Sequence, residues 1–178
     1  YPLRVIHAGP LPGVRCPPPT PSELTAGSHI MRLLKNIHEP RGALWVAITV
    51  GDREVQLVNT HLGLRRGERL IQVNALLSSE WLGHPDCRSP VIFCGDFNAQ
   101  PGSKVCRRIR QHFHDAQLLL NDHRPQRTFF GRFPVGRIDH VFVSPEITVL
   151  GVEVPRTSLT RIASDHLPLI VEAGVAIR

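Results

Sequence analysis

Two β-rich runs separated by a short polar turn segment between residues 43 and 62 predict a β-hairpin. Two runs rich in β-branched residues, ALWVAITV at 43–50 and EVQLVNTHL at 54–62, flank the short segment GDR. Gly and Asp favour tight turns because they adopt backbone conformations that most residues avoid. The pattern therefore predicts two neighbouring antiparallel strands.

Helical periodicity follows the hairpin. Within residues 66–82, the apolar side chains Leu70, Val73, Leu77 and Trp81 recur at spacings of three or four positions. Side chains at these spacings share one face of an α-helix, so the segment predicts an amphipathic helix.

The remaining periodic segments predict one more helix and four more strands. The helix is expected over 103–113, where Ser103 is a suitable N-cap because its hydroxyl can accept a hydrogen bond from the first turn. Short apolar runs bounded by Pro, Gly and Ser predict strands at 90–95, 137–144, 147–155 and 164–175. Helices and strands in mixed order predict an α/β layered fold, with 1–178 as a single domain.

A proline-rich segment lies near the start of the chain. Residues 9–25 hold six prolines. Each proline fixes its own backbone and disfavours helix in the residue before it, so the segment predicts an irregular surface loop.

The composition narrows the class of partner. With 178 residues, 42% of them hydrophobic, the chain can bury one core, and no apolar run is long enough to predict a transmembrane segment. The net charge of +6 favours a polyanionic partner such as nucleic acid or an anionic lipid head group. We expect a soluble protein with no obligate protein partner evident, in a compartment that the sequence leaves open, with the cytoplasm favoured.

Polar side chains stand where an apolar strand ends. The run VIFC at 91–94 leads directly into GDFN, which carries Asp96 and Asn98. Residues two apart in a strand face the same side, so these two polar groups can point together while Phe97 turns toward the core. The alternative interpretation is an ordinary turn, since Asp, Asn, Pro and Gly are all favoured there.

The same arrangement recurs three times along the chain. Asn59 and His61 end one apolar run, Asp139 and His140 open another, and the pair Asp165–His166 precedes a third. Any one of these pairs is explained by capping or by a satisfied core residue. Because strand ends at one edge of a sheet are where α/β folds place their sites, the repetition favours one shared site.

The order NTHL, GDFN, IDH and SDH resembles that of the endonuclease/exonuclease/phosphatase superfamily of metal-dependent phosphoesterases. This superfamily includes pancreatic-type deoxyribonuclease, AP endonucleases, inositol-phosphate 5-phosphatases, neutral sphingomyelinases and deadenylases. The resemblance covers roughly residues 40–173. It implies a deoxyribonuclease I-like fold, a layered β-sandwich flanked by helices.

The resemblance also implies catalytic roles for five residues. Asp96 would activate or orient the attacking water, and Asn98 would contact the phosphoryl oxygens. His166 would stabilise the negatively charged transition state, oriented by Asp139, while His61 would lie close to the phosphate. Such an assembly suits phosphodiester hydrolysis, which needs an in-line water and a neutralised phosphoryl group.

A divalent cation and a phosphodiester substrate complete this expectation. The resemblance implies Mg²⁺ or Mn²⁺ held by oxygen ligands, with Asp165 as the candidate metal ligand. Asn59 is a candidate substrate-binding residue because it shares a strand face with His61. The segment 124–137 interleaves arginines with phenylalanines, and its Arg127, Phe129 and Arg137 are further candidates for contacting a phosphate or stacking on a base.

Other interpretations of these segments stay open. The phenylalanines of 124–137 can instead pack under the sheet while the arginines face water. The arginines of 65–69 and 106–113 are interpreted as solvated helix faces.

The superfamily pattern breaks before the hairpin. Its fold begins with an Asn-bearing strand, a helix and a strand carrying the Glu that is its principal metal ligand. The acids that precede Arg41 are Glu23 and Glu39, and neither has a strand context. We therefore expect a C-terminal portion of such a domain, incomplete at its N-terminus and weakly active or inactive by itself.

Three functions remain from the sequence. The leading one is a phosphodiesterase that cleaves nucleic acid. A phospholipid or sphingomyelin-type phosphodiesterase comes second. The third is a non-catalytic or degenerate member that binds a phosphorylated partner.

Overall fold

Eight strands form two sheets, and three α-helices and one 3-10 helix (η2, Ala116–Leu118) accompany them in the part of the chain that the structure describes. The computed structural model describes residues 3–13 and 40–175. The elements, in chain order, are β1 (Leu3–Pro10), β2 (Gly42–Val50), β3 (Arg53–His61), α2 (Arg66–Leu76), β4 (Val91–Asp96), α3 (Lys104–Ile109), β5 (His114–Asp115), β6 (Asp139–Val143), β7 (Ile147–Glu153), α4 (Thr160–Ala163) and β8 (Ile170–Val175).

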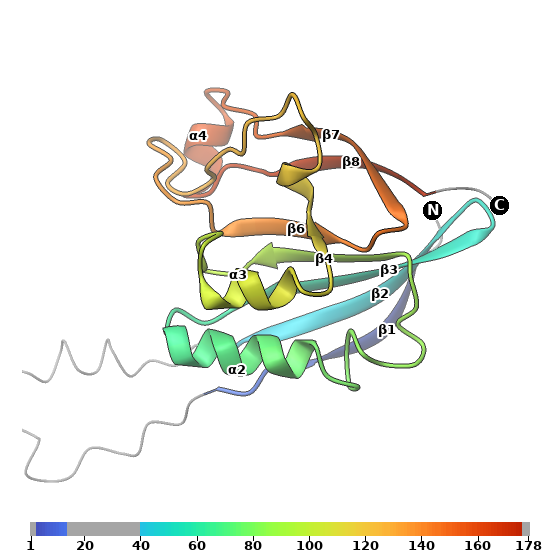
Figure 1. Cartoon of the computed structure of the whole chain (residues 1–178). Coiled ribbons are helices and arrows are strands. Elements are labelled where there is room, and N and C mark those ends of the chain that lie inside the picture. Colours follow the sequence, from blue (N-terminus) through green and yellow to red (C-terminus); the bar gives the residue numbers. More distant parts are fainter. Residues whose placement is uncertain (1–2, 14–39, 176–178) are drawn as a thin grey trace, which may run out of the picture.

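The larger sheet has six strands in the order β1-β2-β3-β4-β6-β5, and β7 pairs with β8 in the smaller one. Helices α2 and α3 cover one face of the larger sheet, and the β7–β8 sheet lies against the other (Figure 1). This arrangement confirms the predicted layered β-sandwich flanked by helices.

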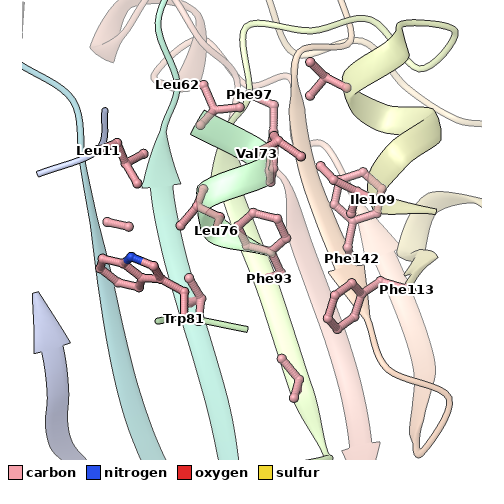
Figure 2. Close-up of a cluster of buried hydrophobic side chains, with 14 of the residues drawn as sticks. Leu11, Leu62, Val73, Leu76, Trp81, Phe93, Phe97, Ile109, Phe113 and Phe142 are labelled. Carbon is pink, nitrogen blue, oxygen red and sulfur yellow. The ribbon is translucent and has the colours of Figure 1, made fainter. Parts of the chain in front are cut away.

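The main core lies between the larger sheet and the two helices. Val73 and Leu76 of α2 and Ile109 of α3 are completely buried against aromatic side chains of the sheet, including Phe93 and Phe142 (Figure 2). A second, smaller core joins the opposite face to β7 and β8 through Val143, Ile147 and Val149. Each face of β4 and β6 is thus packed, which holds these two strands rigidly at the centre of the sandwich.

The predicted hairpin is confirmed. Strands β2 and β3 pair antiparallel from Ala43–Thr60 to Val50–Arg53, around a turn in which Gly51 has a φ of 63°. Positive φ is readily adopted by glycine, which explains its place in this turn.

The expected loop at 9–25 is wrong at its first two residues. Gly9 and Pro10 end β1, which pairs with β2 at the edge of the sheet. A proline is tolerated there because an edge strand does not need every N–H group. Leu11 to Gly13 have no regular structure, and residues 14–25 lie outside the described part of the chain.

The two predicted helices are confirmed, although both are shorter than predicted, and the short helix α4 was not predicted. Helix α2 ends at Leu76, where the Ser78 hydroxyl donates to the Ala75 carbonyl at 2.7 Å and replaces the helical pattern. Trp81 was expected on the helix. It lies instead in the turns that follow α2, and its side chain is buried in the core. Ser103 caps α3 as predicted, accepting a hydrogen bond from the Cys106 N–H group at 3.1 Å.

The last strand also begins later than predicted, at Ile170, so Asp165 and His166 lie in the loop that precedes it. Among the described residues, no helix is long and apolar enough to cross a bilayer. The division of 1–178 as one domain stays a prediction.

Candidate functional site

Three polar residues lie in one row across the end of the larger sheet. In the pairing register, His61 of β3 is opposite Asp96 of β4, and Asp96 is opposite Asp139 of β6. Paired residues on neighbouring strands project to the same face. Because β3 and β4 are parallel while β6 is antiparallel, two strand ends and one strand start meet at this edge of the sheet.

A glycine precedes Asp96 because the backbone comes very close to β3. Gly95 has a φ of 138°, and a Cβ atom there would lie 1.9 Å from the carbonyl oxygen of Thr60. A larger residue would both strain the backbone and clash with its neighbour strand. Gly95 therefore fixes the close pairing that brings Asp96 beside His61.

Asp96 is half-buried at the centre of the site. Its carboxylate accepts a hydrogen bond from the Asn98 N–H group at 2.8 Å, and its Oδ2 lies 3.2 Å from Nε2 of His61. Burial, and then the negative charge of Asp139, raise the pKa of Asp96, against the opposing effects of Asn98, His61 and His166. Two carboxylates in this position favour a cation or a proton between them.

Asn98 is held by its own strained backbone and by the loop after β3. Its φ of 48° lies in the left-handed region, which Asn tolerates better than most residues. Its Nδ2 donates to the carbonyl of Leu62 at 2.8 Å. A carboxamide has two N–H groups, so the second can donate to an anion in the site.

His166 reaches the site from the loop before β8 and is held by Asp139. Its Nδ1 donates to Oδ2 of Asp139 at 2.8 Å, while its Nε2 lies 3.9 Å from Oδ2 of Asp96. The Thr128 hydroxyl donates to the same oxygen of Asp139. The ring of Phe129 packs on the imidazole with centroids 4.8 Å apart, and the two residues also form a backbone bridge.

These contacts favour the protonated form of His166. Burial by itself lowers the pKa of His166, but the hydrogen bond and the charge of Asp139, followed by Asp96 and Asp165, outweigh it and raise the pKa above its ordinary value. The imidazolium then directs its free Nε2–H into the pocket, as a donor that also carries positive charge.

One pocket unites these groups. The residues that line it are Arg41, His61, Leu64, Asp96, Asn98, Phe129, Asp139, Asp165 and His166. Within it, Asp96, Asp139 and His166 each offer a ligand atom within 4.8 Å of the others. The two carboxylates suit a divalent cation, whereas the protonated His166 acts as a hydrogen-bond donor beside it. Asp165 lies at the pocket wall outside this trio, and its role as a metal ligand stays a prediction.

Three predicted substrate-binding residues do not line the pocket. The amide of Asn59 faces the Cys94 thiol, with Nδ2 3.5 Å from Sγ. Arg127, which directly precedes Thr128, is exposed and does not line the pocket. Arg137 is only 6% exposed, and its guanidinium binds both carboxylate oxygens of Asp115. In this arrangement, Arg137 ties the segment before β6 to Asp115 of β5 and does not line the pocket.

Residues that the sequence analysis did not single out also belong to the site. Arg41 and Leu64 line the pocket, and Thr128 binds Asp139. The position of Arg41 could have been predicted from the hairpin, because its register places Arg41 at the same end of the sheet as His61. The positions of Leu64 and Thr128 depend on loop conformations that have no periodic signature.

Comparison with known proteins gives the family of this chain. Residues 4–166 match the model of the Endonuclease/Exonuclease/phosphatase family. The chain belongs to this family. Among curated relatives, it is 30% identical over 137 residues to the uncharacterized protein YbhP of Escherichia coli K12. That match covers 75% of this chain and 53% of YbhP, so the chain spans about half the length of this relative.

Solved structures share the fold at low sequence identity. A functionally unknown conserved protein from Enterococcus faecalis superposes with a TM-score of 0.71 at 23% identity, over 98% of this chain and 68% of the other. The mannosyl-6-phosphatase Bt3783 of Bacteroides thetaiotaomicron superposes with a TM-score of 0.69 at 21% identity, over 97% and 67% of the two chains. These similarities confirm the endonuclease/exonuclease/phosphatase fold.

Proposed function

We propose that the protein is a divalent-metal-dependent hydrolase of phosphoester bonds, acting on phosphodiesters. The observation that carries this proposal is the row His61–Asp96–Asp139 across three strands, with His166 held by Asp139 above it. Family membership supports the general class of phosphoester hydrolase. The choice of phosphodiester rests on the chemistry of the site.

The residues divide the work of hydrolysis among them. Asp96 orients the attacking water and accepts its proton as the water oxygen bonds to phosphorus. His166 donates a hydrogen bond from Nε2 to the phosphoryl group, where negative charge builds up, while Asp139 fixes the orientation of the imidazole. As the bond from phosphorus to the leaving oxygen breaks, solvent water protonates that oxygen. Asn98 donates its second amide hydrogen to a phosphoryl oxygen.

The metal requirement follows from the two facing carboxylates. Asp96 and Asp139 are the residues that would hold Mg²⁺ or Mn²⁺, with Asp165 beside them. When bound, the ion supplies positive charge that neutralises the phosphoryl oxygens.

The substrate class rests on charge and on the surroundings of His166. A net charge of +6 favours a polyanion, and Phe130, which is 51% exposed and packs on Phe129 beside His166, offers a ring on which a base can stack. Nucleic acid is therefore the first substrate to test. A sphingomyelin-type head group and a phosphomonoester follow, the latter because the similar Bt3783 is a mannosyl-6-phosphatase.

The test uses the protein expressed from its complete reading frame, freed of metal with EDTA and then supplied with Mg²⁺. Turnover is measured on plasmid DNA, RNA, sphingomyelin and a phosphomonoester. Asp96→Asn and His166→Ala should each lose most of the activity, whereas the exposed controls Asp86→Asn and His112→Ala should retain it. Unchanged rates in the first two variants would refute the assigned roles.

The 178-residue chain is assayed in parallel, and robust EDTA-sensitive turnover there would contradict the expectation that it lacks a metal ligand.

A further inference from the structure

A second pocket lies next to the candidate site, at the ends of helices α2 and α3. The two helices pack side by side on the same face of the larger sheet (Figure 1). Four of the pocket-lining residues are cationic, namely Arg66 and Arg69 of α2 with Lys104 and Arg107 of α3, and no acidic residue lines it. A hollow with this lining attracts anions.

Three of the four positive charges of this basic pocket lack carboxylate partners in the described part of the chain. No ion pair joins Arg66, Lys104 or Arg107 to an acidic side chain among the described residues. Burial, and then the positive charge of Arg66, lower the pKa of the Arg69 guanidinium. The sequence analysis interpreted these arginines as solvated helix faces, whereas the structure gathers them around one hollow.

The basic pocket and the candidate site share one residue and a loop. Asn98 lines both pockets. Its amide donates to the Leu62 carbonyl, and the Arg69 guanidinium donates to the carbonyl of Leu64 two residues later. An anion in the basic pocket would therefore lie on the other side of Asn98 from a phosphate bound at Asp96.

We propose that the basic pocket binds a second phosphate of the same substrate strand, so that the substrate is an oligonucleotide and not an isolated phosphodiester. This inference rests on the proposed function, because it takes the Asp96 site as the place of the scissile phosphate. Successive phosphates of one strand lie on a continuous backbone, which a cationic groove beside the site can follow.

The alternative occupant of a basic surface is a membrane of anionic lipids. Membrane-surface sites combine basic residues with exposed apolar side chains that enter the bilayer. The apolar residues that line the basic pocket are Leu70, which is half-buried, and Val105, which is 2% exposed. The lining therefore fits a phosphate backbone better than a lipid surface.

The first experiment measures binding without turnover. The protein in EDTA is titrated into a fluorescein-labelled oligothymidylate, and anisotropy is followed at several salt concentrations. The double variant Arg66→Gln/Arg107→Gln should bind roughly tenfold more weakly, and its salt dependence should become shallower by about 1.4 in log–log slope. Arg69 is left intact because it also supports the loop at Leu64.

The matched control removes the same charge elsewhere. Arg88 and Arg108 donate to the Pro85 carbonyl and to Gln111, respectively, and neither lines the basic pocket. Arg88→Gln/Arg108→Gln should change binding less than twofold. Equal losses in both double variants would overturn the proposal, because they would show a general effect of charge. Binding to phosphatidylserine vesicles that depends on Arg66 and Arg107, with oligothymidylate binding unaffected, would also overturn it.

The second experiment isolates the second phosphate. A thymidine dinucleotide with one phosphate and a trinucleotide with two are compared as competitors of the labelled strand. The trinucleotide should compete better with the unaltered protein, and this advantage should disappear in Arg66→Gln/Arg107→Gln. An advantage of equal size in both proteins would overturn the proposal. Binding does not depend on turnover, so if the protein from the complete reading frame shows the expected advantage but hydrolyses none of the four substrates with Mg²⁺, the result contradicts the proposed function and leaves the phosphate subsite standing.

Discussion

Nδ1 of His166 lies 2.8 Å from Oδ2 of Asp139, which precedes it by 27 positions in the chain. This pair links the loop before β8 to the first residue of β6, across the mouth of the pocket. It fixes the orientation of the imidazole and leaves Nε2 directed toward Asp96. The first prediction concerns this pair.

Asp139→Asn should reduce kcat by about 10²- to 10⁴-fold, the usual contribution of a positioned acid or base. It should also shift the alkaline limb of the pH–rate profile. Asp139 raises the pKa of His166, so its loss lowers that pKa, and activity that needs the imidazolium should fall at lower pH than in the unaltered protein. Measuring kcat from pH 5 to pH 10 checks this, and an alkaline limb that does not move would contradict the orientation and charge assigned to Asp139.

Removing one carboxylate should weaken cation binding. Asp96 and Asp139 face each other in register, and Asp96 has a raised pKa partly because of that second charge. We expect Asp96→Asn to weaken Mn²⁺ binding by roughly tenfold or more, measured by calorimetry. Asp86→Asn, at a carboxylate whose side chain is 78% exposed, is the control and should leave the affinity unchanged. Equal Mn²⁺ affinity in all three proteins would mean that the ion binds elsewhere.

Gly95→Ala should destabilise the fold strongly. The added methyl group would meet the Thr60 carbonyl at 1.9 Å, on a backbone with a φ of 138°. We expect a loss of more than about 3 kcal/mol in the free energy of unfolding, measured with urea. Gly67→Ala is the matched control, because its added methyl group would meet no atom within 4 Å and alanine favours a helix by about 0.5–1 kcal/mol. If Gly95→Ala lowers the free energy of unfolding only slightly, β3 and β4 can move apart locally without destabilising the fold, which would contradict the role assigned to Gly95.

The buried His140 should make stability depend on pH. It lies on the helix side of the sheet, with Nδ1 3.8 Å from Oδ2 of Asp115, and Nε2 is 2.8 Å from the Ala99 carbonyl. Burial by itself lowers its pKa, but Asp115 and Cys106 outweigh burial and raise the pKa to about 9.

The sign of this dependence follows from the raised pKa. The stabilisation is fully present below the ordinary pKa of 6.5 and is lost as pH rises through about 9, so stability should decrease over this range. Urea denaturation at pH 6 and pH 9.5 measures it. His140→Phe, which keeps an aromatic ring beside Phe97 and Phe142, should flatten the dependence. The exposed control His112→Ala should retain it, and a dependence that survives in His140→Phe would refute the assignment.

Local patterns in the sequence were enough to predict much of the fold. The hairpin, the buried strand before Gly95, both helices and the Ser103 cap follow from periodicity and turn chemistry, which act between residues close in the chain. The helix ends were less predictable, because the Ser78 hydroxyl competes with the helical hydrogen bonds of α2. Strand β1 was missed because prolines in the same segment favour a loop and only pairing with β2 makes it a strand.

The sequence by itself determined which polar residues end the strands, and their order identified the family. Only the tertiary structure decided which of them meet. The sheet order brings His61, Asp96 and Asp139 into one row, because parallel β3 and β4 end where antiparallel β6 begins. The same packing buries Arg137 against Asp115 and gathers Arg66 and Arg107 around one hollow, since the contacts that turn a side chain inward or outward come from segments distant in the chain.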